Sequence, residues 1–189
     1  MKYDILIAGV GGQGILSLAY VLDHAAMDLG LHFKQNEVHG MAQRGGGVVS
    51  HVRISPDPIH SDTIDIGGAD VIISMEPLEA LRYLQFLKPN GLIITNSEPF
   101  INIPNYPDIA KLKAAFAPYR HLLINAAELA KKVGNPNTQN MVLLGALSRH
   151  LDFPAETMSK WVQACFEAKG QKIMDLNLKA FESGRQQAG

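Results

Sequence analysis

A glycine-rich turn close to the start of the chain has the residue types and spacing of a phosphate-binding loop. Residues 9–14 read GVGGQG, and Gly9, Gly11 and Gly14 fit the spacing G-x-G-x-x-G. They follow an apolar stretch predicted as a strand and precede one predicted as a helix. Glycine permits the tight turn and lets a ligand approach the backbone, and the amino end of the helix presents free N–H groups to an anion. The alternative is that these glycines serve only the packing of strand against helix.

A second glycine cluster about thirty residues later adds a cation. Residues 37–55 read EVHGMAQRGGGVVSHVRIS, so Arg44 directly precedes three glycines. A guanidinium held there can bind a phosphate or a carboxylate through two parallel hydrogen bonds. In the alternative, the glycines form a bulged turn that Arg44 merely caps. The candidate ligand-binding residues are Gly9, Gly11, Gly12, Gln13, Gly14, Arg44, Gly45 and Gly46.

The composition excludes several classes of site. The chain has 189 residues and a net charge of −1, so it offers no basic surface for nucleic acid. Cys165 is the only cysteine, which excludes an intrachain disulfide, a four-cysteine zinc site and an iron–sulfur cluster held by this chain alone. We expect a buried, inert thiol there, and no catalytic residue or metal site on the chain. His39 and His51 have the polar surroundings of a site edge, but a structural role is the more common one for such histidines.

The uncharged stretch over residues 5–22 resembles a membrane segment only superficially. Four glycines, Gln13 and Ser17 interrupt it, and Asp4 precedes it, so the pattern predicts a strand followed by a helix. We therefore expect a protein that stays in the cytoplasm, without contact to a membrane.

The alternation of strands and helices predicts an α/β protein. Strands are predicted at 3–8, 31–35, 47–54, 70–75, 92–95 and 121–125, and helices at 14–29, 76–87, 108–116, 126–133, 138–151, 154–166 and 171–183. This order favours a three-layer, Rossmann-like fold with a mostly parallel sheet, helices on both faces and a helical C-terminal segment. We expect one domain over residues 1–184 and a frayed tail over 185–189.

One predicted helix is apolar on every side. Residues 141–147 read MVLLGAL, and such a helix must be covered all round, either by its own domain or by another subunit. We expect it to lie at a subunit contact, with Leu144 in the interface. Asn140, just before it, is interpreted as a helix-capping residue rather than a contact to a neighbouring loop.

Three separated motifs resemble those of one enzyme family. GMAQRGGGVVSHVR at residues 40–53, together with GVGGQG near the start and NMVLLGAL at 140–147, is similar to the small subunits of indolepyruvate:ferredoxin oxidoreductases. More broadly, the chain resembles the gamma-type subunit or domain of the 2-oxoacid:ferredoxin oxidoreductases, from Asp4 to about Gly184. The stretch over residues 37–46 is more similar to the indolepyruvate branch than to the pyruvate or 2-oxoglutarate branches.

The resemblance implies a subunit of an enzyme that converts a 2-oxoacid and coenzyme A into an acyl-CoA and CO₂ while reducing ferredoxin. In that family, thiamine diphosphate with Mg and iron–sulfur clusters carry the chemistry. The thiamine-diphosphate signature, Gly-Asp-Gly followed later by Asn-Asn, is absent from this sequence. The resemblance therefore assigns these cofactors to a large partner chain, and it implies that ferredoxin interacts with the complex of the two chains. A homodimer of this chain is also possible. It also implies that the glycine loop binds the phosphates of the cosubstrate coenzyme A.

A free-standing NAD(P)- or nucleotide-binding protein is the alternative. A dinucleotide site needs an acidic residue about 20 positions after the glycines for the ribose hydroxyls, and Glu37 lies in that zone. Against this, Glu37 does not end an obvious apolar strand.

Overall fold

The computed structural model describes residues 1–39, 46–101 and 103–188, in which strands and helices alternate. The strands are β1 (Tyr3–Val10), β2 (His32–His39), β3 (Gly47–Ser55), β4 (Ala69–Ser74), β5 (Leu87–Asn96) and β6 (Arg120–Ile124). The α-helices are α1 (Ile15–Asp28), α2 (Pro77–Arg82), α3 (Ile109–Ala114), α4 (Ala126–Val133), α5 (Gln139–Ser148), α6 (Ala155–Phe166) and α7 (Gln171–Gln187). Short 3₁₀ turns are η1 (Leu84–Phe86), η2 (Pro136–Thr138) and η3 (Glu167–Lys169). The predicted α/β class is confirmed.

The described strands form one six-stranded sheet in the order β2-β3-β1-β4-β5-β6. β1, β4, β5 and β6 are parallel, whereas β3 is antiparallel to both of its neighbours, β1 and β2. The sheet is therefore mostly parallel, as predicted, but a β2–β3 hairpin replaces the usual dinucleotide-binding order in which β2 lies beside β1. β2 is also longer than the predicted 31–35, because it pairs with β3 along its whole length, from His32 to His39.

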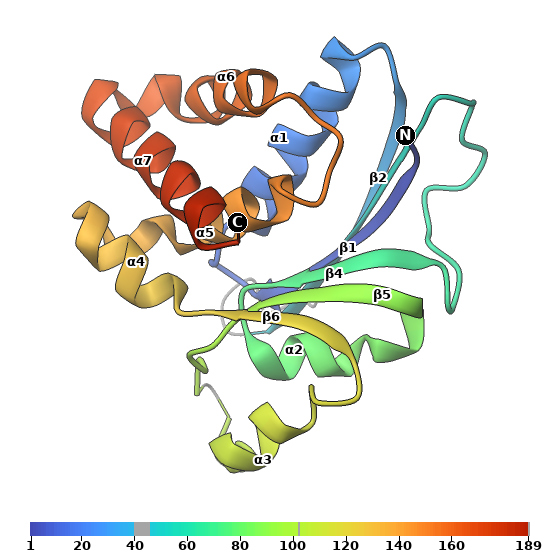
Figure 1. The fold of residues 1–189 in the computed structure, drawn as a ribbon, viewed down its shortest axis with the longest axis vertical. Coiled ribbons are helices and arrows are strands. Elements are labelled where there is room, and N and C mark those ends of the chain that lie inside the picture. Colours follow the sequence, from blue (N-terminus) through green and yellow to red (C-terminus); the bar gives the residue numbers. More distant parts are fainter. Residues whose placement is uncertain (40–45, 102, 189) are drawn as a thin grey trace.

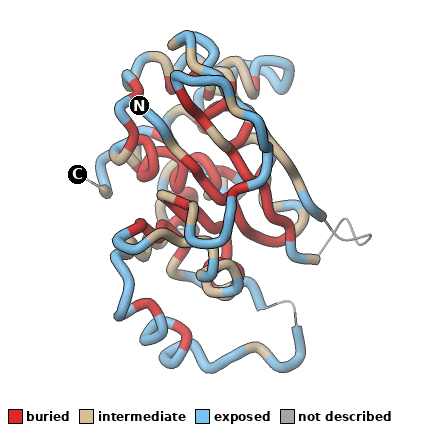
Figure 2. Tube along the Cα trace, turned by 90° about the vertical axis from the view of Figure 1, so that its right-hand side faces the viewer, coloured by how far each residue is buried: buried red, intermediate tan, exposed pale blue. Residues whose placement is uncertain are grey.

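Helices cover both faces of the sheet, which confirms the predicted three layers (Figure 1). One face carries Ile5 and Ile7 of β1 and packs against α1, α5, α6 and α7. The opposite face carries Leu6 and Ala8 and packs against α2 and against Phe116, which follows α3. This alternation along β1 is the period-2 pattern of a strand that is buried on both sides. Figure 2 shows the buried residues running through the centre of the sheet.

The segment between β4 and β5 differs from its prediction. The predicted helix over 76–87 ends at Arg82 and gives way to η1, and β5 already begins at Leu87, five residues before the predicted strand over 92–95. Gly91 explains why Leu87 can lie so close, because a Cβ at Gly91 would lie 2.6 Å from Cδ1 of Leu87. Local apolar periodicity did not distinguish η1 and the start of β5 from a continuation of the helix.

The all-apolar helix α5 is buried within its own chain. Met141 to Leu144, and Leu147, have no exposed surface, and α7 lies directly against the helix. A Cβ at Gly145 would lie 1.9 Å from the carbonyl oxygen of Phe181, and one at Gly184 would lie 1.8 Å from that of Val142. The expectation of a subunit contact at Leu144 was therefore wrong, because α7 covers the side of α5 that the sheet leaves open.

The last helix is longer than predicted. α7 continues to Gln187 rather than ending at 183, so it includes residues that we expected to fray. Gly184 is buried against α5, and the Arg185 guanidinium donates to Oγ of Ser148 at 2.6 Å. These contacts hold the end of the helix, and the sequence pattern gave no sign of them.

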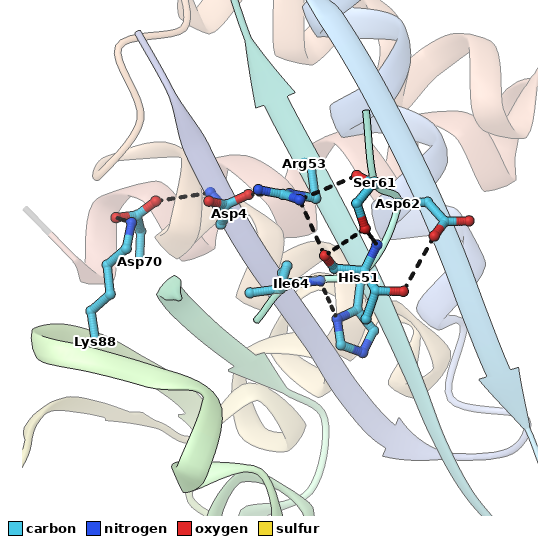
Figure 3. A network of polar contacts seen from close by, with 9 residues as sticks. Asp4, His51, Arg53, Ser61, Asp62, Ile64, Asp70 and Lys88 are labelled. Carbon is cyan, nitrogen blue, oxygen red and sulfur yellow. Dashed lines mark hydrogen bonds and ion pairs between the residues drawn. The ribbon is translucent and has the colours of Figure 1, made fainter. Parts of the chain in front are cut away.

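A polar network ties the long β3–β4 connection to the amino ends of the strands (Figure 3). Arg53 forms an ion pair with Asp4 at 2.7 Å and also donates to the carbonyl oxygens of Ser61 and Thr63. His51 is buried, and its Nδ1 accepts from the Ile64 N–H at 3.2 Å. Burial lowers the pKa of His51, so the ring is held neutral as an acceptor. His51 is therefore structural, as expected.

Candidate ligand-binding site

The GVGGQG segment forms the turn between β1 and α1. The Gln13 N–H donates to the Val10 carbonyl at 3.1 Å, and the Gln13 Oε1 accepts from the Val10 N–H at 2.8 Å. Gln13 thus closes the turn with both its backbone and its side chain. Gln13 also lines a cavity, but the carbonyl oxygen of its side chain is committed to the loop itself.

The glycines of this turn have different roles. A Cβ at Gly9 would lie 2.8 Å from Gln13 Oε1 and 3.1 Å from Cβ of Met75, so Gly9 serves close packing. Gly14 has φ +77°, and a Cβ there would lie 2.5 Å from Nδ2 of Asn140. Gly12 has φ +99°, and a Cβ there would have no atom within 4 Å. Gly12 therefore combines a left-handed backbone with open space in front of it, the arrangement that lets a ligand reach the backbone.

The two glycine clusters of the sequence meet in space. The Gly11 N–H donates to the Gly46 carbonyl at 2.9 Å, next to the start of β3. This contact follows from the pairing of β1 with β3, in which Val10 lies opposite Gly47. Arg44 and Gly45 lie outside the described residues, as does the side chain of His39.

The amino end of α1 is free of capping groups. Its N-cap is Gly14, with no side-chain cap, and its first turn contains no acidic residue. The first N–H groups of a helix have no partner within the helix, and they carry the positive end of its dipole. The end of α1 next to Gly12 is therefore able to bind an anion.

Asn140, 126 residues away, holds this loop in place. Its Nδ2 donates to the Gly14 carbonyl at 3.2 Å, and the side chain is 6% exposed. The N-cap of α5 is Thr138, so the expectation that Asn140 caps its helix was wrong. Asn140 makes the contact to a neighbouring loop that we considered and did not favour, because only the fold brings α5 beside the start of α1.

A cavity of about 490 Å³ opens in front of the loop. One wall is the glycine turn with Ser17 of α1, and the opposite wall comes from the C-terminal helices. Its lining residues outside the turn include Met75, Phe100, Asn135, Asn137, Gln139, Asn140, Phe166, Lys169, Ile173 and Asn177. The cavity lies at the carboxyl ends of β1 and β4, whose connections run to opposite faces of the sheet, the position where open α/β sheets bind ligands.

The apolar rim of this cavity is fixed by a buried carboxylate. Glu76, 2% exposed, accepts from the Glu79 N–H at 3.0 Å and from the Phe100 N–H at 3.4 Å, and Tyr106 donates to the same carboxylate. Burial and this hydrogen bond raise the pKa of the Tyr106 phenol, so it remains a donor. Glu76 therefore links the start of α2 to the loop that carries Phe100.

Glu37 faces a second, smaller cavity and not the main one. This cavity of about 400 Å³ shares residues 12–14 of the glycine turn with the main cavity and is also lined by Gly11, Leu16 and Val48. Because β3 lies between β1 and β2, Glu37 is two strand spacings, about 10 Å, from β1. The carboxylate expected of a dinucleotide site stands on the strand next to β1.

The donor set does not fit a metal or an iron–sulfur cluster. Within the described residues, no three His, Cys, Asp or Glu side chains are grouped to hold a metal ion. Cys165 is half-buried, and burial raises the pKa of its thiol, as expected for an unreactive cysteine. Also within the described residues, no helix is long and apolar enough to cross a membrane.

Sequence reasoning missed the wall opposite the glycine loop. Asn135, Asn137, Lys169 and Asn177 line the cavity but were not among the predicted site residues. The amide-rich run GNPNTQN at 134–140 was a signal for part of this wall. Nothing in the sequence indicated Asn177 on α7.

Comparisons with known proteins agree with this fold. The sequence matches the family described as "Pyruvate ferredoxin/flavodoxin oxidoreductase" over residues 4–187. It is 39% identical to the "Indolepyruvate oxidoreductase subunit IorB" of Pyrococcus horikoshii, over 97% of this chain and 94% of the relative. The protein of the same name from Archaeoglobus fulgidus is also 39% identical, over 100% of this chain and 96% of the relative.

Solved structures show the same fold. The "keto/oxoacid ferredoxin oxidoreductase, gamma subunit" of Geobacter sulfurreducens superposes with a TM-score of 0.73 at 26% identity, covering 98% of both chains. A 2-oxoglutarate:ferredoxin oxidoreductase from Magnetococcus marinus, solved with 2-oxoglutarate, coenzyme A and succinyl-CoA bound, gives a TM-score of 0.78 at 22% identity. It covers 99% of this chain and 31% of the longer one. The fold thus occurs both as a separate subunit and as part of a larger polypeptide.

The chain therefore belongs to the pyruvate ferredoxin/flavodoxin oxidoreductase family, as its three motifs indicated. Within that family it is a subunit of a 2-oxoacid:ferredoxin oxidoreductase, and its relatives at 34–39% identity are of the indolepyruvate type. This membership replaces the alternative of a free-standing nucleotide-binding protein.

Proposed function

We propose that this chain is the cytoplasmic subunit that holds neither thiamine diphosphate nor iron–sulfur clusters in an oxidoreductase for indolepyruvate or another aryl pyruvate. The enzyme converts the 2-oxoacid and coenzyme A into acyl-CoA and CO₂ and passes two electrons to ferredoxin. The names of the IorB relatives support the substrate class. The single cysteine supports the assignment of the clusters to another chain, because one thiolate cannot supply the ligands of such a cluster.

The partner is then a large subunit that carries thiamine diphosphate, Mg and the clusters, and ferredoxin docks on the complex. The bond-breaking chemistry belongs to those cofactors. This chain contributes binding and orientation of a ligand. Its own site is the glycine turn with the cavity in front of it. For a ligand bound there to reach the cofactors, the mouth of the cavity must face the large subunit.

The glycine turn binds phosphates of coenzyme A in this proposal. The observation that carries it is Gly12, whose left-handed backbone faces open space beside the uncapped amino end of α1. Gly11 and Gly46 join the two glycine clusters, so Arg44 and Gly45 lie two and one residues from that contact along the chain. We assign Arg44 to the same anion as a bidentate partner.

Substitution of Gly12 tests this assignment in the reconstituted complex. Gly12→Val places a branched side chain in the approach to the backbone and strains a left-handed φ, so the KM for coenzyme A should rise tenfold or more, with little change in the KM for the 2-oxoacid. Steady-state kinetics with each substrate varied in turn provides the measurement.

Gly30→Val is the matched control. Gly30 also has a left-handed φ, +69°, and open space around its Cβ, but it follows the opposite end of α1. It should carry the same backbone strain without affecting coenzyme A. Unchanged coenzyme A kinetics in a folded, assembled Gly12→Val complex would show that the turn is only structural.

A further inference from the structure

We propose that Asn177 is the hydrogen-bond acceptor for a neutral N–H group of the ligand whose anionic end lies at the glycine turn. The inference rests on the proposed function, because it extends the same cavity to its opposite wall. It assigns a recognition role to a residue of α7, 163 positions after Gly14 in the sequence.

The Asn177 side chain is buried and its orientation is fixed. It is 3% exposed, it lines the 490 Å³ cavity, and its Nδ2 donates to the Ile173 carbonyl at 2.8 Å. A carbonyl oxygen can bond only to the amide nitrogen, so this contact decides which end of the amide is which. The Oδ1 is then left on the side away from Ile173.

This oxygen accepts no hydrogen bond from the described residues, and it is not one of their fully buried polar atoms, so it keeps accessible surface. Asn140, the other buried amide of the cavity, uses both ends of its side chain, on Gly14 and on the Met141 N–H. Asn177 differs in that no other residue described by the structure uses its acceptor. The cavity is the place from which a donor can reach it.

The two walls of the cavity therefore select different chemistry. The glycine turn offers N–H donors and a helix dipole, which suit an anion. The Asn177 Oδ1 is an acceptor that attracts an N–H group and repels phosphate oxygens. The apolar side chains of Phe166 and Ile173 also line the cavity, and the ammonium of Lys169 lies 5.2 Å from the Phe166 ring centre.

The volume allows both contacts at once. A cavity of about 490 Å³ is within the usual range of small-molecule sites, and it exceeds what a phosphate group alone would fill. The ligand class is thus a phosphorylated molecule that carries an amide or amino N–H beyond its phosphates. Coenzyme A has two kinds of such group, the two pantetheine amides and the adenine amino group.

Calorimetric titration of the full chain, alone and in complex with its large subunit, tests this inference. The ligands are inorganic pyrophosphate, 4′-phosphopantetheine, adenosine 3′,5′-bisphosphate and coenzyme A. Asn177→Leu keeps the branched shape of the side chain and removes the acceptor, so the affinity for coenzyme A should fall about three- to tenfold while that for pyrophosphate stays the same. The fragment that loses affinity along with coenzyme A identifies the donor as pantetheine or adenine.

Gln163→Leu is the matched control, because Gln163 is an exposed amide on α6 outside the cavity. Asn177→Ser withdraws the acceptor without adding apolar volume, and it replaces Asn177→Leu if that variant does not fold. Wild-type affinity for coenzyme A in a folded variant overturns the role of Asn177 and leaves the glycine-turn proposal standing. Failure of the wild-type complex to bind either coenzyme A or pyrophosphate overturns both.

Discussion

At the scale of single residues, Asp23 is the most unusual side chain outside the site. It lies on α1, which packs against β3 and α6, and it is 5% exposed. Its Oδ1 is buried and has no hydrogen-bond partner among the residues that the structure describes. Burial raises the pKa of this carboxyl to about 7, because the low-dielectric surroundings disfavour the charged form.

The raised pKa predicts a loss of stability with rising pH. The unfolded chain releases this proton near pH 4, whereas the folded protein retains it up to about pH 7. The contribution of Asp23 to the free energy of unfolding is therefore fully present below about pH 4. It decreases between about pH 4 and pH 7, by at most roughly 4 kcal/mol. Asn at position 23 does not titrate, so Asp23→Asn should flatten the dependence, measured as urea unfolding at pH 4.5, 6 and 7.5.

Asp57→Asn is the control for this prediction, since Asp57 is exposed in the β3–β4 connection. It should follow the wild-type profile. If Asp23→Asn also follows the wild-type profile, the Asp23 carboxyl does not cause the loss of stability with rising pH.

At the scale of elements, the contact between α5 and α7 depends on two glycines. Gly145 and Gly184 each face a backbone carbonyl of the opposite helix, with no room for a Cβ. Helices approach this closely only where a side chain is missing, and the gain is the complete burial of the apolar face of α5. The element that the sequence suggested for a subunit interface is instead the centre of the chain's own helical layer.

Gly145→Ala should therefore destabilise the protein although alanine is the better helix former. In an exposed helix the change would stabilise by about 1 kcal/mol. Here the new methyl group would lie 1.9 Å from the Phe181 carbonyl oxygen, so the two helices must separate, at a cost of about 3 kcal/mol or more. Thermal and urea unfolding, followed by circular dichroism, would measure the change.

Ser183→Ala provides the comparison, because it changes the residue next to Gly184 and not the one that faces α5. It should be close to neutral. Equal stability of Gly145→Ala and the wild type would mean that α5 and α7 can move apart freely.

At the scale of the whole molecule, the chain is one part of an enzyme. It has a ligand cavity and a scaffold, but its donor set cannot hold the clusters of the family. We predict that the purified chain shows no 2-oxoacid-dependent reduction of a viologen dye when thiamine diphosphate, Mg²⁺ and coenzyme A are supplied. Addition of the large subunit should restore turnover, and sustained turnover by the chain alone would disprove the proposed division of roles.

The sequence by itself determined the α/β class, the place of the glycine turn and the family. These depend on local patterns, namely runs of apolar residues with period 2 or 3.6 and glycines at fixed spacing beside a strand. Helix α4 and strands β1, β3 and β4 were predicted to within two residues at each end for this reason. The weakly apolar β2 was underestimated, because its hydrogen bonds come from pairing with β3 and not from its own composition.

Only the tertiary structure decided what surrounds the turn. Asn140 and Asn177 are 126 and 163 positions from Gly14, and no local pattern links residues at such distances. The same is true of α5, whose apolar faces could meet a partner or the chain's own α7 equally well until the packing was known. The hydrophobic effect requires that this apolar surface be covered, but it does not determine which element covers it. The three-dimensional arrangement of the helices determines that.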